Sequence, residues 1–321
     1  MDLLKKHVPP SDKGAMSVEC PFADSSGFLG LRKTSPDQGP GPTYLSVGTG
    51  VNPSLDRSAS KTKHHHQHPS MPSPTRPSDP SFLDHPDFRE PAVNQFWNHL
   101  FFLHWIERAE RLRAILPSGL ELDEHAGSAF VGIVGSLVDA VRPEGLPVMP
   151  WLSYFCELNV RIYVRDPRGT PGVYFLSLDC NRAIAVWIGR SFFGLPYRHA
   201  SMNFGATTEE FTLQCRRLGW NRDRADYAWQ PVSLPKVSPP GTLEHHLFER
   251  YQYFTRHRGR LYEGSVSHAP CEVSQALFSN WSALPLAWNG LPIPDGPPDF
   301  AHYCRGVSVA VYPIRPFETS V

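Results

Sequence analysis

The feature that most constrains the fold is a nine-residue stretch in which polar and apolar side chains alternate, Glu157-Leu-Asn-Val-Arg-Ile-Tyr-Val-Arg165. Successive side chains of a β-strand point to opposite faces, so this period of two predicts a strand with one apolar and one polar face. A turn sequence follows over residues 167–172, and a second apolar run follows over 173–178. Together these segments predict a β-hairpin whose first strand carries Glu157, Asn159 and Arg161 on its polar face.

Strand patterns dominate the chain around this hairpin. Short helices are expected over residues 107–116 and 182–193, and in the second one Ile184, Trp187, Ile188 and Phe192 form an apolar stripe. Many strands with few short helices indicate an α+β domain, mainly antiparallel β, in which a curved sheet or barrel has helices packed outside it. Further strands are expected over 101–106, 129–141, 211–216, 228–234, 251–255, 261–267 and 307–314.

The first 90 residues differ from the rest in composition. Prolines crowd the segments 36–42 and 69–80, and the eight Trp all lie from Trp97 onward. Apolar residues are too sparse here to offset the entropy of ordering. We therefore expect a disordered Pro/Ser/Gly-rich tail over 1–90 and one folded domain over 95–318. Because Met71 directly precedes the ordered pattern, we hypothesise that residues 1–70 are a gene-model over-extension and that the true start is Met71.

The charge balance argues against one class of partner. The chain has 31 Lys+Arg and 31 Asp+Glu, whereas a nucleic-acid-binding protein needs a basic surplus to neutralise phosphates. The longest uncharged apolar stretch, residues 126–138, is shorter than the roughly 20 residues of a membrane-spanning helix. The six Cys are scattered and form no C-x-x-C pair. We expect a cytoplasmic protein that binds neither nucleic acid nor membrane.

Motifs for common cofactor and catalytic chemistry are absent from the sequence. It contains no G-x-S-x-G, H-E-x-x-H, Walker A or G-x-G-x-x-G pattern, so we expect no bound cofactor. Four histidines between His64 and His68 fall in the expected tail, which offers a metal no fixed geometry. His245 and Glu249 would share one face of a helix, but a solvated or capping role is favoured. The sequence predicts no metal site.

Two polar features remain as site candidates. His268 ends an expected strand, where it could serve as a general acid or base or could hydrogen-bond a turn. The polar strand face of Glu157, Asn159 and Arg161 could be a solvated outer face. If the sheet closes, the same residues would line a cavity, where a Glu and an Arg can orient a ligand. Composition does not separate these alternatives.

Longer motifs resemble a known family. The resemblance is to the YqjF-like family of uncharacterised conserved proteins, over about residues 97–316, and it departs from the family pattern at Cys271, where a Trp is expected. The segments that carry it are 157–164, 172–179, Leu195-Pro-Tyr197, Leu116-Pro-Ser-Gly-Leu120, Phe248-Glu-Arg-Tyr251, His268-Ala-Pro270 and Pro297-Pro-Asp299, together with Trp105.

This family is in turn similar to the acetoacetate decarboxylase-like superfamily, through the run Ala183–Arg190 and the following Leu195-Pro-Tyr-Arg198. The resemblance implies a closed antiparallel β-barrel or cone with a few short helices, enclosing a ligand cavity. A shared fold does not carry an activity with it. At the position of the decarboxylases' Schiff-base lysine this chain has Tyr197, and Arg198 replaces the neighbouring lysine. Because a phenol cannot form an imine, Schiff-base decarboxylation is not expected.

Three functions stay open at this point. In the first, the protein binds a small carbonyl or carboxylate ligand, held by Arg161, Arg190, Arg198 and Asn159. In the second, it is an enzyme of lyase or hydrolase type, in which Tyr197 transfers a proton, Arg198 or Arg190 holds a carboxylate, and Glu157 or His268 is the base. In the third, it is a non-catalytic structural or interaction module without a pocket.

Overall fold

The computed structural model describes residues 90–219 and 222–318. The expectations of a disordered tail and of a true start at Met71 lie outside these residues. The longer strands are β1 (Val93–Glu107), β3 (Ala129–Pro143), β4 (Phe155–Arg165), β5 (Pro171–Cys180), β6 (Tyr197–Ala206), β7 (Phe211–Arg217), β8 (Ala225–Pro231), β10 (Gln252–His257), β11 (Arg260–His268), β12 (Glu272–Asn280) and β13 (Phe300–Val311). The two-residue strands are β2 (Glu121–Leu122), β9 (Lys236–Val237) and β14 (Arg315–Pro316). The helices are α2 (Ala109–Arg113), α3 (Ala183–Phe192), α4 (Leu243–Phe248) and α5 (Leu284–Ala287).

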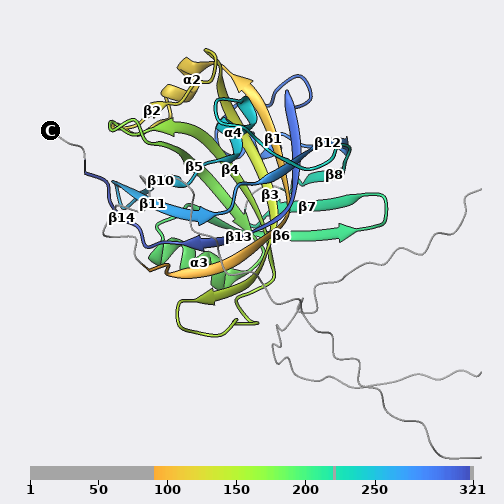
Figure 1. Ribbon diagram of the computed structural model, residues 1–321, viewed down its shortest axis with the longest axis horizontal. Coiled ribbons are helices and arrows are strands. Elements are labelled where there is room, and N and C mark those ends of the chain that lie inside the picture. The colour runs from red at the N-terminus through yellow and green to blue at the C-terminus, as the bar shows by residue number, and fades with distance from the viewer. Residues whose placement is uncertain (1–89, 220–221, 319–321) are drawn as a thin grey trace, which may run out of the picture. The chain divides into compact units, whose positions relative to one another are not determined.

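The strand pairings run in a ring (Figure 1). From β11 they pass through β10, β5, β4, β3, β1 and β13, and β13 pairs again with β11. A second path leads from β5 through β6, β7, β8 and β12 to β13. The pairings are antiparallel except that β5 runs parallel to both β10 and β6. The sequence-based expectation of a mainly antiparallel α+β domain with a few short helices is therefore confirmed.

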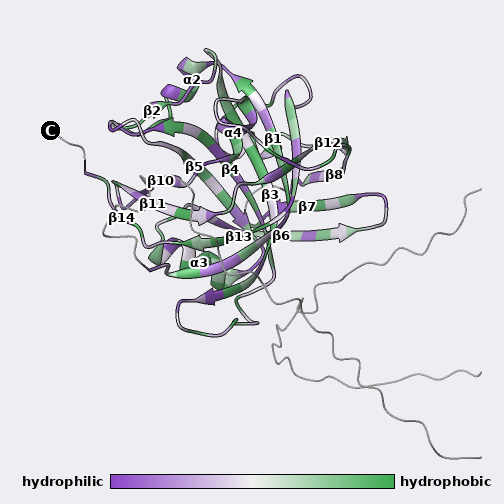
Figure 2. Cartoon of the chain, in the orientation of Figure 1, coloured by the Kyte–Doolittle hydropathy of each residue, from purple (hydrophilic) through white to green (hydrophobic). Residues whose placement is uncertain are grey.

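The predicted hairpin is formed by β4 and β5, whose register extends from Glu157↔Cys180 to Arg165↔Pro171. Leu158, Val160 and Ile162 of β4 are completely buried and pack in the main core. Because side chains alternate across a strand, this packing turns the polar residues of β4 to the opposite face. Figure 2 shows hydrophobic and hydrophilic residues interspersed along the strands.

The main core is built around aromatic rings that meet on one side of the sheet. Phe101 of β1 lies 4.8 Å, between ring centroids, from both Tyr227 and Trp229 of β8. Gly135 of β3 makes room for it, because a Cβ there would come within 2.3 Å of the Phe101 ring. A buried ion pair lies nearby on β5 and β7, where Arg217 donates two hydrogen bonds of 2.7 Å to the Asp179 carboxylate.

The structure corrects several sequence-based details. The expected strand over 228–234 lies at 225–231, and β6 and β12 were not predicted. The apolar stripe expected on α3 packs only in part: Ile184 and Ile188 lie against a buried cluster, whereas Trp187 and Phe192 are 56 % and 62 % exposed. The helix instead buries its small residues, among them Gly189, because these let the helix approach the sheet closely. None of the helices in the described part of the chain has the length and apolarity to cross a membrane.

Candidate functional site

A cavity of about 160 Å³ lies where α3 and the face of β4 opposite the main core come together with β1, β3, β5, β10 and β11. Most of its wall is apolar and comes from side chains such as Trp97, Phe102, Phe155, Phe175 and Phe193. Such a wall with a few polar groups is typical of small-molecule sites. The polar groups in the lining are Gln95, Ser136, Glu157, Asn159, Arg161, Tyr197, Arg250, Gln252, Tyr253 and His268.

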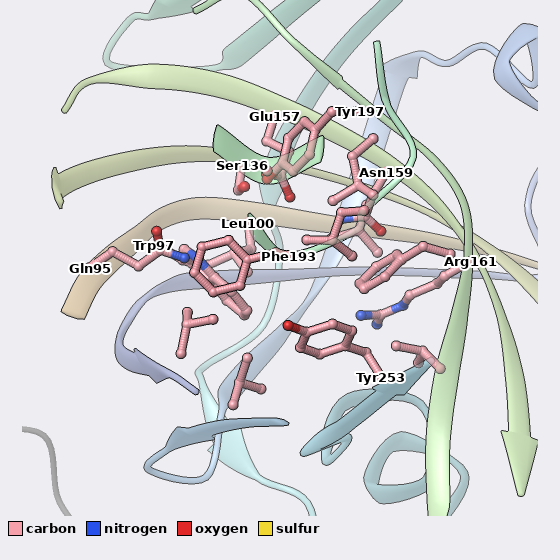
Figure 3. A pocket seen from close by; sticks show the side chains of 18 of the residues that line it. Gln95, Trp97, Leu100, Ser136, Glu157, Asn159, Arg161, Phe193, Tyr197 and Tyr253 are labelled. Carbon is pink, nitrogen blue, oxygen red and sulfur yellow. The ribbon is translucent and has the colours of Figure 1, made fainter. Parts of the chain in front are cut away.

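The polar face of β4 contributes three of these groups. Glu157, Asn159 and Arg161 all line the cavity, so this strand face is not a solvated outer surface (Figure 3). Their common orientation follows from the period of two along β4, whose other face is held in the main core. Tyr197, the first residue of β6, lies beside Glu157.

Glu157 and Tyr197 form a hydrogen-bonded pair. The Tyr197 hydroxyl donates to Oε2 of Glu157 at 2.5 Å, and the Asn159 side chain hydrogen-bonds the same carboxyl group. Burial raises the pKa of Glu157, and the two hydrogen bonds act in the opposite direction. Burial and the neighbouring Glu157 raise the pKa of Tyr197 well above its ordinary value, so Tyr197 is a neutral donor. Gly189 of α3 provides the space for the Tyr197 ring, since a Cβ at this position would lie 2.4 Å from it.

Arg161 presents a positive charge to the cavity. Its Nε donates to the Tyr163 hydroxyl at 3.2 Å and its Nη2 to the Leu247 carbonyl at 3.1 Å, while the guanidinium lies over the Phe102 ring at 5.6 Å. Within residues 90–219 and 222–318, no carboxylate forms an ion pair with it. The other arginine in the lining, Arg250, is paired with Asp123 at 2.5 Å.

Three polar atoms of the lining are buried without a hydrogen-bond partner among the described residues. They are the Tyr253 hydroxyl, Oδ1 of Asn159 and Oε1 of Gln252. Tyr253 is 4 % exposed, and its ring lies against Gly264 of β11, where a Cβ would come within 2.4 Å of the hydroxyl oxygen. Since buried polar groups in proteins are nearly always hydrogen-bonded, these atoms are suited to contacts with a molecule inside the cavity.

His268, at the end of β11, makes the hydrogen bond to a turn that the sequence analysis considered, and its acid/base role stays a prediction. It lines the cavity and is also bound to a turn, because its Nδ1 lies 2.8 Å from the Ala269 carbonyl. Since a carbonyl only accepts, Nδ1 carries the proton and Nε2 is the ring nitrogen with a free electron pair. Burial lowers the pKa of His268, which favours the neutral ring.

The two remaining arginine candidates do not face the cavity. Arg198 follows Tyr197 on β6 and is exposed, because neighbouring residues of a strand point to opposite sides. Arg190 of α3 is also exposed. Neither belongs to the lining. The sequence analysis missed Tyr253 and Gln252, because their strand segment offered only a short aromatic run that does not show which side faces the interior.

Metal coordination finds no support in this region. Among the residues that the structure describes, no group of three or more His, Cys, Asp and Glu side chains is arranged to hold a metal ion. His246 of α4 lies 3.7 Å from Asp123, whose carboxylate is bound by Arg165 and Arg250. This cluster links β4 to the segment around α4.

Comparisons with solved structures confirm the fold that the resemblance implied. The structure of acetoacetate decarboxylase from Legionella pneumophila aligns with a TM-score of 0.50 and 13% identity, over 74% of this chain and 94% of that one. The enduracididine biosynthesis enzyme MppR complexed with pyruvate aligns with a TM-score of 0.50 and 13% identity, over 76% and 98%. At this identity the likeness shows an acetoacetate decarboxylase-like fold and no more.

Sequence comparisons identify a nearer group. The chain is 32% identical over 223 residues to the uncharacterized protein YqjF of Bacillus subtilis (strain 168), which covers 70% of this chain and 91% of that protein. Residues 94–308 match the DUF2071 family, described as "Uncharacterized conserved protein (COG2071)". This stretch includes all the polar residues of the cavity lining. The chain belongs to the DUF2071 family.

Proposed function

We propose that the protein binds a small organic acid, with or without an additional carbonyl group, in the cavity between β4 and α3. The observation that carries this proposal is the Arg161 guanidinium, which faces an apolar cavity without a carboxylate partner among the described residues. The guanidinium is half-buried and its hydrogen bonds go to neutral oxygens, so no carboxylate of the described residues balances its charge. A ligand carboxylate would supply the missing pair, with two parallel hydrogen bonds from the guanidinium.

The dimensions of the site limit the size of the acid. Arg161 and Glu157 are four residues apart on β4, which separates their Cα atoms by about 13 Å. A cavity of about 160 Å³ between them accepts a molecule of a few carbon atoms. The apolar walls favour an aliphatic body. The Tyr253 hydroxyl can donate to a second oxygen on the ligand, whereas Oδ1 of Asn159 and Oε1 of Gln252 can only accept, for example from a ligand hydroxyl.

The residues that line the cavity also argue against Schiff-base chemistry. No lysine lines the cavity in the part of the chain that the structure describes, and Lys236 is exposed on β9. Tyr197 is bound to Glu157 through its hydroxyl and cannot form an imine. The proposal therefore concerns binding without the Schiff-base chemistry of the decarboxylases.

The proposal is tested by titrating short aliphatic carboxylates and keto acids, each with its uncharged amide, into the protein by calorimetry. We expect the acids to bind and the amides to bind at least tenfold more weakly, since only the acids can pair with Arg161. Arg161→Gln should abolish this preference. Arg198→Gln, which removes an equally charged but exposed side chain outside the cavity, is the matched control and should keep it.

Two outcomes would overturn the proposal. One is binding of the amides as tightly as the acids. The other is a loss of acid binding in Arg198→Gln that equals the loss in Arg161→Gln. If no acid binds at all, the cavity is not an acid site, and the alternative of a structural or interaction module gains.

A further inference from the structure

We propose that the cavity catalyses enolisation of a bound keto acid, with Glu157 as the base that takes a proton from the carbon next to the carbonyl group and Tyr253 as the hydrogen-bond donor to the carbonyl oxygen. This inference rests on the proposed function, because Arg161 must hold the acid in place. It adds a reaction, a substrate class and a role for Tyr253.

The arrangement of the three groups supports a reaction between them. Figure 3 shows Glu157 and Tyr197 on one side of the cavity and Arg161 and Tyr253 on the other. A keto acid whose carboxylate binds Arg161 would extend its carbon chain along β4 toward Glu157. The carbonyl group and its neighbouring carbon would then lie between Tyr253 and Glu157, which is the placement that enolisation needs.

Glu157 has the surroundings of a strong carboxylate base. It lies in an apolar cavity, where burial raises its pKa, so that it holds a proton more firmly than an exposed carboxylate does. The hydrogen bonds from Tyr197 and Asn159 fix the orientation of the carboxyl group. Tyr197 is thus a positioning residue, whose own hydroxyl is committed to Glu157 and whose ring is seated on Gly189.

Tyr253 is the group best placed to stabilise the oxygen of the enolate. Its hydroxyl is buried in the cavity and has no hydrogen-bond partner among the described residues. Burial raises the pKa of Tyr253, so it stays a neutral O–H donor. Its ring lies against Gly264 and is held in one position, which allows a donor to stabilise developing charge without reorganisation.

The proposed step is balanced within the site. The Glu157 carboxylate takes the proton, the electron pair of the C–H bond forms the new C=C bond, and the π pair of the C=O bond moves to the oxygen that Tyr253 binds. In the reverse step the enolate takes a proton back from Glu157. When the Glu157 proton exchanges with solvent between the two steps, the net result in D₂O is replacement of C–H by C–D, with no oxidation or reduction.

The test is proton NMR of 2-oxobutanoate and 4-oxopentanoate in D₂O with the full chain, alongside calorimetric binding of the same acids. We expect the protein to accelerate loss of the C–H signals next to the carbonyl of at least one acid that binds. Glu157→Gln, which is close to isosteric, should lower this exchange rate by about 10²-fold or more, the usual contribution of a general base. Tyr253→Phe should lower it by about 10- to 10³-fold.

The pH–rate profile of Tyr197→Phe tests whether Tyr197 positions the Glu157 carboxyl group. It removes a donor that lowers the pKa of Glu157, so the rising limb of the pH–rate profile should move to higher pH. A purely structural role would lower the rate at every pH without moving the limb. Arg198→Gln serves as the control and should exchange like the wild type.

The outcomes separate this inference from the proposed function. If acids bind and none shows accelerated exchange, enolisation is rejected and acid binding stands. If exchange persists unchanged in Glu157→Gln while binding is retained, Glu157 is not the base and the inference is overturned. If neither acid binds, the failure belongs to the proposed function. Binding by each variant also shows that it has folded.

Discussion

Two arginines on strands of one sheet have opposite surroundings. Arg217 of β7 is buried and fully engaged, with two hydrogen bonds to Asp179 and a third, of 3.0 Å, to Ser177. Arg161 of β4 reaches the cavity, where its partners among the described residues are neutral oxygens and aromatic faces. Asp179 completes the charge pairing of Arg217, whereas no carboxylate of the described residues pairs with Arg161; on the proposed function a ligand carboxylate would do so.

The two arginines also differ in how closely other side chains pack around them. Near Arg217 the space is filled, and its guanidinium lies 4.9 Å from the centre of the Trp288 ring. Near Arg161 a cavity remains, with unpartnered polar atoms on Asn159 and Tyr253. Arg217 is buried with its counterion in place, which is typical of a structural pair, whereas Arg161 is half-buried beside the cavity with no carboxylate partner among the described residues. Changes at the two arginines should therefore affect different properties.

The largest effect is expected from Arg217→Met, which leaves the Asp179 carboxylate buried without its partner. Loss of one member of a buried ion pair costs about 3–5 kcal/mol in the free energy of unfolding. Urea denaturation measures it, and the double variant Arg217→Met/Asp179→Leu should recover much of the loss. A single variant as stable as the wild type would show that the pair does not have the structural role assigned to it.

Arg161→Gln should have a small effect on stability and a large effect on ligand affinity. It removes a charge that has no carboxylate partner among the described residues, so the loss of stability should be smaller than for Arg217→Met. Affinity for a small acid should fall by about 1.5–3 kcal/mol, which is roughly 10- to 150-fold in Kd. Calorimetry and urea denaturation on the same preparation measure both quantities. Loss of stability without loss of affinity would remove the distinction between the two arginines.

Gly189→Ala tests how the site is held in place. Alanine in a helix interior normally stabilises by up to about 1 kcal/mol. Here the added Cβ would lie 2.4 Å from the Tyr197 ring, and overpacking of this kind costs about 1–3 kcal/mol. We expect net destabilisation in the wild type and none in a Tyr197→Ala background, as a double-mutant cycle measures. An equal effect in both backgrounds would mean that Gly189 does not accommodate Tyr197.

The smallest effect is the pH dependence contributed by Glu157. Burial raises its pKa in the folded state, so the folded protein holds this proton more firmly than the unfolded chain. The contribution of Glu157 to the free energy of unfolding is therefore fully present below the ordinary Glu pKa of about 4. It is lost as the pH rises through the raised pKa of the folded state. The stability of Glu157→Gln relative to wild type should increase over that window in denaturation curves. If the difference in stability between Glu157→Gln and the wild type stayed constant with pH, burial would not raise the pKa of Glu157 as stated.

The sequence alone was sufficient to predict strand β4, which lies at the centre of the site, and the residues on its polar face. The alternation from Glu157 to Arg165 predicted a strand and placed Glu157, Asn159 and Arg161 on one face, because the side-chain period of a strand is local. Whether that face meets solvent or a cavity depends on the pairings that close the ring, such as β11 with β13, which join segments far apart in the chain.

The same limit explains the residues that sequence analysis placed less well. Arg198 was grouped with Tyr197 because the two are neighbours, but neighbours on a strand face opposite ways, and Arg198 is exposed. Nothing in the sequence indicated that Tyr253 lines the cavity, since its orientation follows from the parallel pairing of β10 with β5. The family resemblance predicted the fold, whereas the residues that line the cavity became known only from the structure.

A crystal structure with the tightest-binding acid would show whether Arg161 pairs with the carboxylate of a small acid. We expect the acid inside the cavity, with its carboxylate oxygens within hydrogen-bond distance of the Arg161 guanidinium and its aliphatic part against Phe102 and Val134. An acid bound at the exposed Arg190 or Arg198, with the cavity holding only water, would contradict this pairing.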